Sequence, residues 1–336
     1  MGGQQKRIDF PNRPTISDKV EFSENFGRRF IVTVDTEEEF DWSKPFERSG
    51  YQTSTTSVLQ EFQTFCDEYE VCPVYLVDYP IMMHDNACKI LAGFVENGKA
   101  SVGVQLHPWV NPPFEEEINN FNSFAGNLQK PLEEKKFTIL RDLIVKKIGV
   151  EPIIYRAGRY GVGPNTARLL ADNEIKIDSS VRSNFDYSHE HGPNFTGFPL
   201  VPYWIDRAAG LMEVPLTTVF SGYLRKYGSA LYPKINNSPR LRGIFSRTGL
   251  LERIALTPEG ITEKEAIKAI DIAIESDIPI LNFSFHSPSL RPGHTPYVND
   301  RADLMRFYDW FKSVFEHMKA KDVLPATIDD ILRAPV

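Results

Sequence analysis

Short apolar, β-prone runs alternate with helical segments along most of the chain. The β-prone runs cover residues 29–35, 71–79, 101–107, 151–156, 174–180, 212–220 and 278–286. Between and after them, the spacing of apolar residues predicts helices over 55–69, 86–97, 133–148, 164–172, 262–276 and 300–320. Strands that alternate with helices pair in parallel through right-handed crossovers. We therefore expect an α/β fold, and the number of units favours a closed or nearly closed β/α barrel over an open sheet.

Two stretches depart from this alternation. Residues 1–27 form a polar arm that contains Pro11 and Pro14. Residues 221–250 are basic and rich in turn formers, which predicts an insertion or a lid loop. Residues 28–336 are otherwise expected to form a single domain.

Composition and charge exclude several classes of protein. The 336 residues can bury a large core, and a net charge of −7 argues against a nucleic-acid-binding surface. No apolar run is long enough for a membrane span, and the polar N-terminus lacks an apolar signal region, so a cytoplasmic location is expected. The three cysteines have no zinc-type spacing and are expected to be reduced structural thiols.

Chemically active side chains stand where the apolar runs end. They are Asp35, His107, Arg156, Asp178 and His286. In β/α barrels the reactive groups lie at the C-terminal ends of the strands. We therefore expect these segments to converge at one mouth of the barrel, with the His107 imidazole facing the Asp35 carboxylate.

An acidic cluster follows the first apolar run. Asp35, Glu37 and Glu39 would share one side of an extended strand. Close carboxylates either raise the pKa of some members or bind a cation, and both outcomes serve hydrolysis. The three glutamates alone would better suit a solvated acidic loop, but Asp35 directly follows a run that is expected to be buried.

The histidines and arginines suit distinct roles. His107 shares a strand face with Gln105 and suits a zinc ligand, whereas His286 suits a general acid. Either imidazole could instead be a hydrogen-bonded structural group. Arg156 and Arg159 can each orient a carboxylate. Asp178 could equally be a turn or helix cap.

Aromatic side chains near these segments are candidates for stacking on a sugar. They are Trp109, Tyr160 and Tyr203. His189 and His191 could supply a metal ligand or lie in a mobile substrate loop. The chain contains neither a GxSxG elbow nor an HExxH pair, which argues against a serine hydrolase or a metallopeptidase.

Taken in order, five segments resemble the motifs of the NodB-type polysaccharide deacetylases, and within them the WalW-like branch. The segments are TVDTEEEFDW, LHPWVNPP, YRAGRYG, IDSSV and NFSFHSPSLRPGHTPYV. The resemblance spans residues 29–333 and implies a distorted (β/α)7 barrel. It also implies metal-assisted hydrolysis of an N- or O-linked acetyl group on a sugar.

The resemblance also implies roles for individual residues. Asp35 matches the catalytic base, Glu37 and His107 look like metal ligands, and His286 is similar to the general acid. Arg156 would brace the base, and Asp178 would orient the histidine across the site.

The chain departs from the family pattern in its second motif, which usually supplies two histidines one helical turn apart. Gly103 and Gln105 stand where the partner of His107 would be sought, and Thr36 replaces the second acid of the usual aspartate pair. A divalent metal, with zinc expected, could be weakly held, of another kind, completed by Glu38 or His191, or absent.

The sequence thus predicts a metal-dependent hydrolase that removes an acetyl group from a carbohydrate or an acetylated small molecule. Two alternatives remain at this stage. The barrel could be a catalytically inactive carbohydrate-binding protein that has lost its metal. It could also be a metal-dependent amidase that acts on a small non-sugar amide.

Overall fold

The computed structural model describes residues 13–41, 44–236 and 238–336. The first part of the expected polar arm, residues 1–12, and Trp42 of the first motif lie outside the described residues. No described helix has the length and apolarity needed to cross a bilayer.

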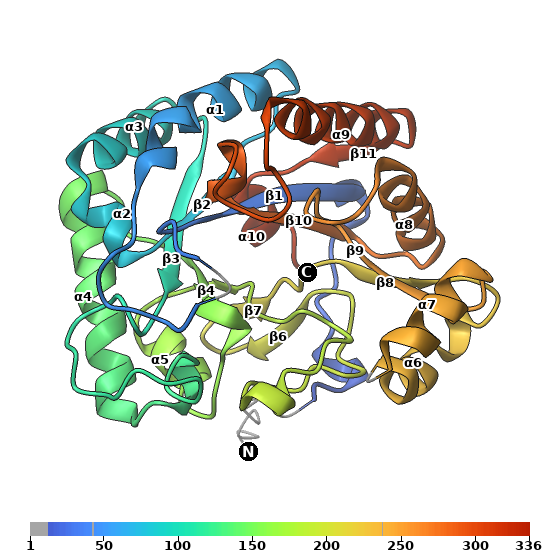
Figure 1. Cartoon of the computed structure of the whole chain (residues 1–336), viewed down its shortest axis with the longest axis horizontal. Coiled ribbons are helices and arrows are strands. Elements are labelled where there is room, and N and C mark those ends of the chain that lie inside the picture. Colours follow the sequence, from blue (N-terminus) through green and yellow to red (C-terminus); the bar gives the residue numbers. More distant parts are fainter. Residues whose placement is uncertain (1–12, 42–43, 237) are drawn as a thin grey trace.

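A curled, mostly parallel sheet forms the centre of the molecule, and helices cover its outer face (Figure 1). The strand order is β10-β1-β2-β3-β4-β5-β7-β6, with β11 beside β1, and all pairs except β6–β7 are parallel. These strands are β1 (Arg28–Thr36), β2 (Val74–Val77), β3 (Ser101–Leu106), β4 (Ile154–Ala157), β5 (Ile177–Asp178), β6 (Tyr203–Asp206), β7 (Leu211–Glu213), β10 (Ile280–His286) and β11 (Val323–Pro325). An antiparallel pair, β8 (Thr218–Ser221) and β9 (Glu252–Ala255), stands beside them.

The sheet forms a half-barrel, and the chain after β7 completes the ring. Thr217 N–H donates to Asn282 O at 3.2 Å, and Asn282 N–H donates to the Thr217 hydroxyl at 2.9 Å. Ser284 N–H of β10 reaches Leu256 O, next to β9, at 3.2 Å. These bonds join β10 to the segments beside β8 and β9, so the predicted distorted β/α barrel is confirmed.

Six helices of the barrel fall close to the segments predicted from spacing, namely α1 (Leu59–Glu68), α3 (Asp85–Glu96), α4 (Lys130–Ile148), α5 (Thr166–Asp172), α8 (Glu263–Glu275) and α9 (Arg301–Ala320). Two short helices, α2 (Tyr79–Met83) and α10 (Ile328–Arg333), lie outside those segments. The single strand predicted over 212–220 is wrong. Residues Leu211–Glu213 and Thr218–Ser221 are separate strands, and Pro215 between them has no N–H to give to a ladder.

The insertion is a helical hairpin, so the prediction of a loop over 221–250 is wrong. It contains α6 (Gly228–Asn236) and α7 (Pro239–Arg247), which lie beside β8 and β9 (Figure 1). Ser238 caps α7, and Pro239 occupies its first turn, where a missing N–H costs nothing. Phe220, Tyr232, Ile235 and Leu251 give the hairpin a small apolar core of its own.

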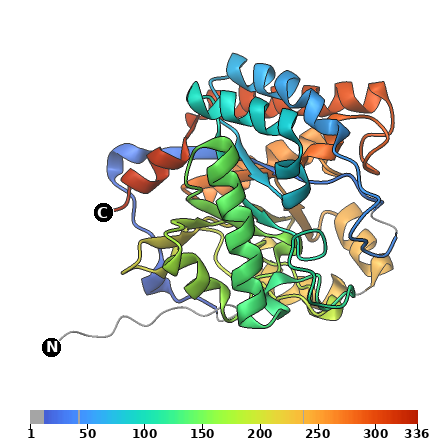
Figure 2. The ribbon, with the colours of Figure 1, turned by 90° about the vertical axis from the view of Figure 1, so that its left-hand side faces the viewer.

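The end of the barrel where the strands begin is closed by residues 20–26 and the last residues of the chain, which lie side by side at the left of Figure 2. Phe22 forms a bridge with Pro335, and Ser23 N–H donates to Ala334 O at 2.9 Å. Val20 and Phe26 are buried there, so the described part of the N-terminal arm packs against the barrel.

The barrel interior changes from apolar to polar toward the other end. Because side chains alternate along a strand, Ile31, Thr33 and Asp35 of β1 all face inward. The lowest inward layer is apolar and contains Ile31, Val74, Leu76, Ile154, Ile177, Met212 and Ile280. Above it Thr33 donates to Asn282 Oδ1 at 3.2 Å, and the carboxylate of Asp35 begins the mouth. At the mouth of the barrel, Asp35 and His286 come from the C-terminal ends of β1 and β10.

A buried carboxyl on the outer layer gives a test of this packing. Glu133 of α4 accepts a hydrogen bond from the Thr166 hydroxyl at 2.6 Å, but its Oε2 has no hydrogen-bond partner. Burial raises the pKa of Glu133 from 4.5 to about 7. A carboxyl whose pKa is higher in the folded protein than in the unfolded chain binds its proton more tightly when folded. It stabilises the folded state at pH values below its unfolded pKa. This stabilisation is lost as the pH rises through its folded pKa.

We therefore expect Glu133→Gln to stabilise the protein relative to wild type by on the order of 2 kcal/mol at pH 8, with little gain at pH 4.5. Urea unfolding followed by circular dichroism at several pH values measures this difference. Glu151→Gln, at an exposed position after α4, is the control and should leave the pH dependence unchanged. Parallel pH curves for wild type and Glu133→Gln would contradict the assignment.

Candidate active site

The mouth of the barrel holds a cleft of about 320 Å³. Seven residues singled out in the sequence line it, namely Asp35, Glu37, His107, Trp109, Arg159, Tyr160 and His286. The expectation that His107 and Asp35 face a common space is therefore confirmed. Arg182 and Gln105 line the same cleft.

Asp35 is held by a buried guanidinium. Arg156, 1% exposed, forms an ion pair with the Asp35 carboxylate. Its remaining N–H groups donate to Ser179 O at 2.8 Å, to the Thr33 hydroxyl at 2.8 Å and to the Ser179 hydroxyl at 3.0 Å. An arginine whose three nitrogens all donate hydrogen bonds has a fixed orientation, and its planar fork in turn fixes the carboxylate beside it. Arg156 thus braces the proposed base from inside the barrel.

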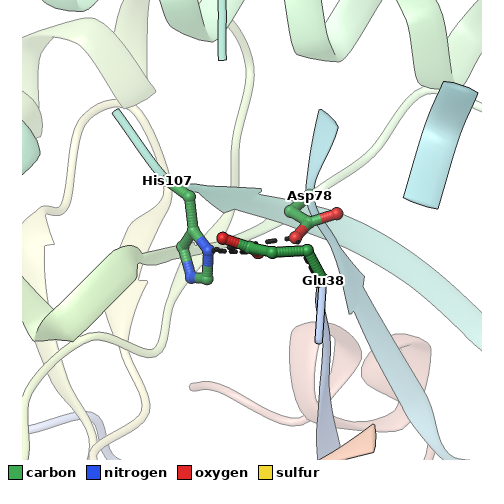
Figure 3. A group of neighbouring side chains, drawn as sticks. All are labelled: Glu38, Asp78 and His107. Atoms are coloured by element: carbon green, nitrogen blue, oxygen red, sulfur yellow. Dashed lines mark hydrogen bonds and ion pairs between the residues drawn. The ribbon is translucent and has the colours of Figure 1, made fainter. Parts of the chain in front are cut away.

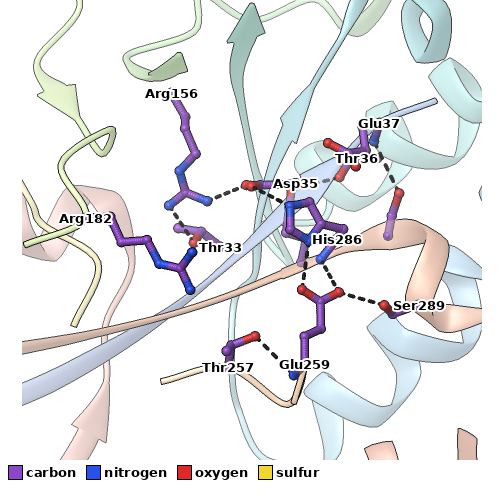
Figure 4. Close-up of polar contacts among 12 residues, drawn as sticks. Thr33, Asp35, Thr36, Glu37, Arg156, Arg182, Thr257, Glu259, His286 and Ser289 are labelled. Atoms are coloured by element: carbon purple, nitrogen blue, oxygen red, sulfur yellow. Dashed lines mark hydrogen bonds and ion pairs between the residues drawn. The ribbon is translucent and has the colours of Figure 1, made fainter. Parts of the chain in front are cut away.

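His286 lies across from Asp35 because strands β1 and β10 are in register at these two residues. Its Nε2 lies 3.7 Å from Asp35 Oδ2, and its Nδ1 lies 2.7 Å from Glu259 Oε2 (Figure 4). The His286 backbone N–H and the Ser289 hydroxyl both donate to Glu259 Oε1. Burial opposes the charged imidazole, but Glu259, Glu37 and Asp35 together raise the pKa of His286 to about 10.

The prediction that Asp178 orients this histidine is wrong in this structure, because Glu259 occupies that position. Asp178 lies deeper, at the end of the short strand β5, where it accepts a hydrogen bond from Ser180 and shares another with Glu213. Burial raises the pKa of both carboxyls, that of Asp178 to about 7. Asp178 therefore supports the floor behind Arg156 and does not contact the imidazole.

His107 is anchored on the side that faces away from the cleft. Its Nδ1 lies 2.9 Å from Glu38 Oε2, and Glu38 Oε1 accepts the Trp109 indole N–H at 2.8 Å. The Trp109 ring also stacks on the imidazole, with centroids 4.4 Å apart. Asp78 lies behind Glu38 and accepts its backbone N–H at 2.8 Å (Figure 3). Trp109 thus fixes the imidazole of His107, and only the edge of that ring on the side of the cleft is left to bind a ligand.

Glu38, Asp78 and His107 bring possible ligand atoms within 4.8 Å of one another and could hold a metal ion. All four of their carboxylate oxygens, however, already accept hydrogen bonds, from Trp109, His107, Ile81 N and Glu38 N. A carboxylate that accepts the Nδ1–H of a histidine fixes its tautomer and leaves Nε2 as the metal donor. We therefore interpret Glu38 and Asp78 as the support for a metal site on the other side of the ring.

The opposite face of the ring has the donors that a divalent cation needs. Glu37 Oε2 lies 3.5 Å from His107 Nε2, and burial beside other carboxylates raises the pKa of Glu37 to about 8. Gln105, 2% exposed, lines the same cleft, and its Oε1 has no hydrogen-bond partner. An orphaned amide oxygen, an imidazole nitrogen and a surplus of buried negative charge fit a divalent metal.

Two glycines explain the unusual second motif. A Cβ at Gly103 would lie 2.6 Å from Ile154 O, so the strand interior has no room for a second histidine there. A Cβ at Gly158 would lie 2.4 Å from His107 Cδ2, so the glycine of the third motif makes space for the imidazole. Gln105 is therefore the residue that β3 presents to the cleft beside His107.

Three further predictions fall outside the cleft. Tyr203 cannot stack on a sugar, because its ring is 1% exposed within β6 at the closed end of the barrel. Glu39 turns away from Asp35 and Glu37, and it binds the Ser54 hydroxyl at 2.8 Å. His191 ends a short turn and packs its ring against Phe121, so it does not line the cleft.

Two functional candidates escaped the sequence analysis. Asp78 follows the apolar strand β2 directly, so the rule that identified Asp35 would also have found it. Glu259 stands four residues after β9, in a Pro-Glu-Gly turn, and only the fold brings it to His286.

The fold is similar to that of solved proteins. A probable polysaccharide deacetylase from Pseudomonas aeruginosa PAO1 aligns with a TM-score of 0.50 and 13% identity, over 98% of this chain and 97% of that one. The 4-alpha-glucanotransferase from Thermococcus litoralis aligns with a TM-score of 0.54 and 10% identity, over 92% of this chain and 41% of that one. No protein-family model and no curated protein matches the chain. Identities this low establish a shared β/α-barrel fold and nothing about activity.

The contact between His286 and Glu259 gives a direct test of the site. In the metal-free protein we expect the His286 imidazole to stay protonated to about pH 10, because three carboxylates surround it. Glu259→Gln removes the closest of them and should lower the His286 pKa by more than one unit, about 1.4 kcal/mol or more. Imidazole ¹⁵N chemical shifts followed through a pH titration measure this value. Glu263→Gln, at the exposed start of α8, is the control, and an unchanged titration in Glu259→Gln would exclude the pairing.

Proposed function

We propose that this protein is a metal-dependent hydrolase that removes an N- or O-linked acetyl group from a carbohydrate. The observation that carries the proposal is the pairing of Asp35 and His286 at one cleft, each held by its own buried partner. A carboxylate base and an imidazole acid kept protonated, 3.7 Å apart, are the two groups that acyl hydrolysis requires.

The chain's own residues divide the proton transfers between them. Asp35, held in place by Arg156, accepts a proton from the attacking water. His286, kept protonated by Glu259, donates a proton to the leaving amine or alcohol. Because the two groups have opposite charges before the reaction, neither needs to exchange a proton with solvent first.

Residues on the other side of the cleft would hold the metal. We propose His107 Nε2 and Glu37 as ligands, with Gln105 Oε1 as a further donor, and zinc as the ion. A bound divalent metal would polarise the acetyl carbonyl and acidify the water. Trp109 and Glu38 hold the imidazole in the tautomer that this arrangement needs.

Membership of the NodB-type polysaccharide deacetylases, in the WalW-like branch, is part of the same proposal. The five motifs in order support it, as does the fold shared with a probable polysaccharide deacetylase. Tyr160 and Arg159 line the cleft beside the reacting groups and are proposed to position the sugar.

One observation favours a different function, a sugar-binding barrel without catalysis. Gln105 stands beside His107 where the family has a second histidine, and glutamine is an uncommon zinc ligand. Elemental analysis of protein purified without added metal separates the two functions. Stoichiometric metal supports the hydrolase, and protein that stays metal-free in the presence of excess zinc supports the binding protein.

Replacement of the base tests catalysis. Asp35→Asn should lower kcat for acetate release from N-acetylated chitooligosaccharides or acetylated xylan by about 10³-fold, because the amide cannot accept the proton. The exposed variant Asp172→Asn is the control. Asp35→Asn also leaves Arg156 buried without its partner, so the rate is normalised to the folded fraction measured by thermal unfolding. Full activity in Asp35→Asn would refute the role.

Measurements of zinc affinity distinguish a metal bound beside Glu37 from a metal bound beside Glu38 and Asp78. Glu37→Gln should weaken zinc binding by more than about 100-fold, because it removes a ligand. Glu38→Gln should weaken it by about 10–100-fold, because it removes only the support of the imidazole. Competition with a chromophoric chelator measures both constants. A larger loss in Glu38→Gln than in Glu37→Gln would place the ion on the Glu38 and Asp78 side.

A further inference from the structure

A second, larger cavity adjoins the cleft. Its volume is about 860 Å³, and Arg159, Tyr160 and Arg182 line both spaces. One wall is the loop over residues 184–190, and the other is the helical insertion, which contributes Tyr232, Pro233, Asn236 and Arg242. The cleft and the cavity therefore adjoin each other at these three residues.

Two guanidinium groups enclose one aromatic ring in this cavity. Arg182 Cζ lies 4.0 Å from the Phe185 ring centroid, and Arg253 Cζ lies 3.4 Å from it. Arg253 also lies 4.7 Å from the centroid of Tyr232. The rings fix both arginines in place while their N–H groups remain available for hydrogen bonds.

These arginines have no acidic partner among the described residues. No carboxylate of residues 13–41, 44–236 or 238–336 forms an ion pair with Arg182, Arg242 or Arg253. Arg253 donates to the backbone oxygen of Asn184 at 2.7 Å, and Arg182 makes a long contact of 3.4 Å with the Tyr187 hydroxyl.

The acids that line the cavity are already engaged. Glu190 pairs with Arg159, and Asp186 accepts the Ser188 backbone N–H at 2.9 Å. Burial, together with the nearby Arg182 charge, lowers the pKa of Arg253 to about 10. Partly buried arginines normally have a carboxylate partner in an ion pair. Four arginines and two carboxylates line this cavity, so positive charge is in excess there.

We propose that this cavity is a subsite for a negatively charged group of the substrate, a phosphate or a carboxylate on an acidic saccharide. Arg182 and Arg253 bind the anion, and the planar fork of arginine suits either group. The proposal rests on the proposed function, because the acetylated sugar ring is then the part that occupies the adjoining cleft. It goes further, since it restricts the substrate to acidic carbohydrates.

The aromatic side chains of the cavity fit this occupant. Tyr160 and Tyr187 stack at a centroid distance of 5.7 Å along the passage from the cleft, and Phe185 and Tyr232 lie beside the arginines. Such rings pack against the apolar faces of sugars. The insertion thus has a function in this proposal: α6 and α7 build the outer wall of the anion subsite.

Binding of three N-acetylated probes to the Asp35→Asn protein tests the proposal without interference from turnover. The probes are neutral N-acetylglucosamine, N-acetylglucosamine 1-phosphate and a disaccharide of N-acetylglucosamine and glucuronic acid. Isothermal titration calorimetry should show that at least one charged probe binds about tenfold or more tightly than the neutral sugar. Preference for the phosphate or for the disaccharide identifies the source of the charge. Equal affinity for all three probes overturns the proposal.

Matched arginine variants locate the site. Arg253→Gln should weaken binding of the preferred charged probe by about tenfold and leave the neutral sugar unchanged. Arg242→Gln, on the exposed surface of α7, cannot disturb the core and should weaken the same probe to a smaller extent. Arg240→Gln, on the same helix but outside the cavity, is the control. Loss of affinity in Arg240→Gln equal to that in the other two variants overturns the assignment.

Failure of this inference differs from failure of the proposed function. If acetate is released from neutral and charged saccharides at equal kcat/KM, the hydrolase stands and the anion subsite does not. If the charged probe binds tightly through Arg253 and no acetate is released with zinc present, the subsite stands and the hydrolase does not.

Discussion

The buried ion pair between Arg156 and Asp35 is the constraint on which the rest of the site depends. An arginine enclosed in a barrel is tolerated only when its charge is paired and its N–H groups are all bonded. Here Thr33, Ser179 and Asp35 complete that set. The pair therefore fixes strands β1, β4 and the end of β5 relative to one another and holds the carboxylate in place at the mouth.

From this pair outward, each reacting group is positioned by a partner that does not itself face the substrate. Glu259 holds His286, and Glu38 holds His107 while Trp109 holds Glu38. Asp35, His107 and His286 are thus each fixed by a hydrogen-bonded partner behind them. Such preorganisation would allow a small set of side chains to support the proposed hydrolysis.

The helical insertion extends this arrangement away from the reacting groups. It adds an arginine- and tyrosine-lined wall to a barrel whose own strands already supply the catalytic candidates. Shared folds serve many functions through such additions, because strand ends fix the chemistry while loops and insertions shape the space around it. In a molecule of this architecture, residues of the insertion that bind a ligand can therefore change without a change in the residues at the strand ends.

Sequence alone determined the barrel and the residues at its mouth, because apolar runs of strand length end at Asp35, His107 and His286, and parallel strands must bring those ends together. It did not identify Glu259, since the local sequence does not show where the loop after β9 runs. It did not identify the role of Glu38, since the local sequence does not show which way each of the three consecutive glutamates points. Tyr203 looked equivalent to Tyr160 until tertiary packing placed it at the closed end. A buried charged side chain pairs with whichever side chain lies close to it in space, and only the folded chain determines those distances.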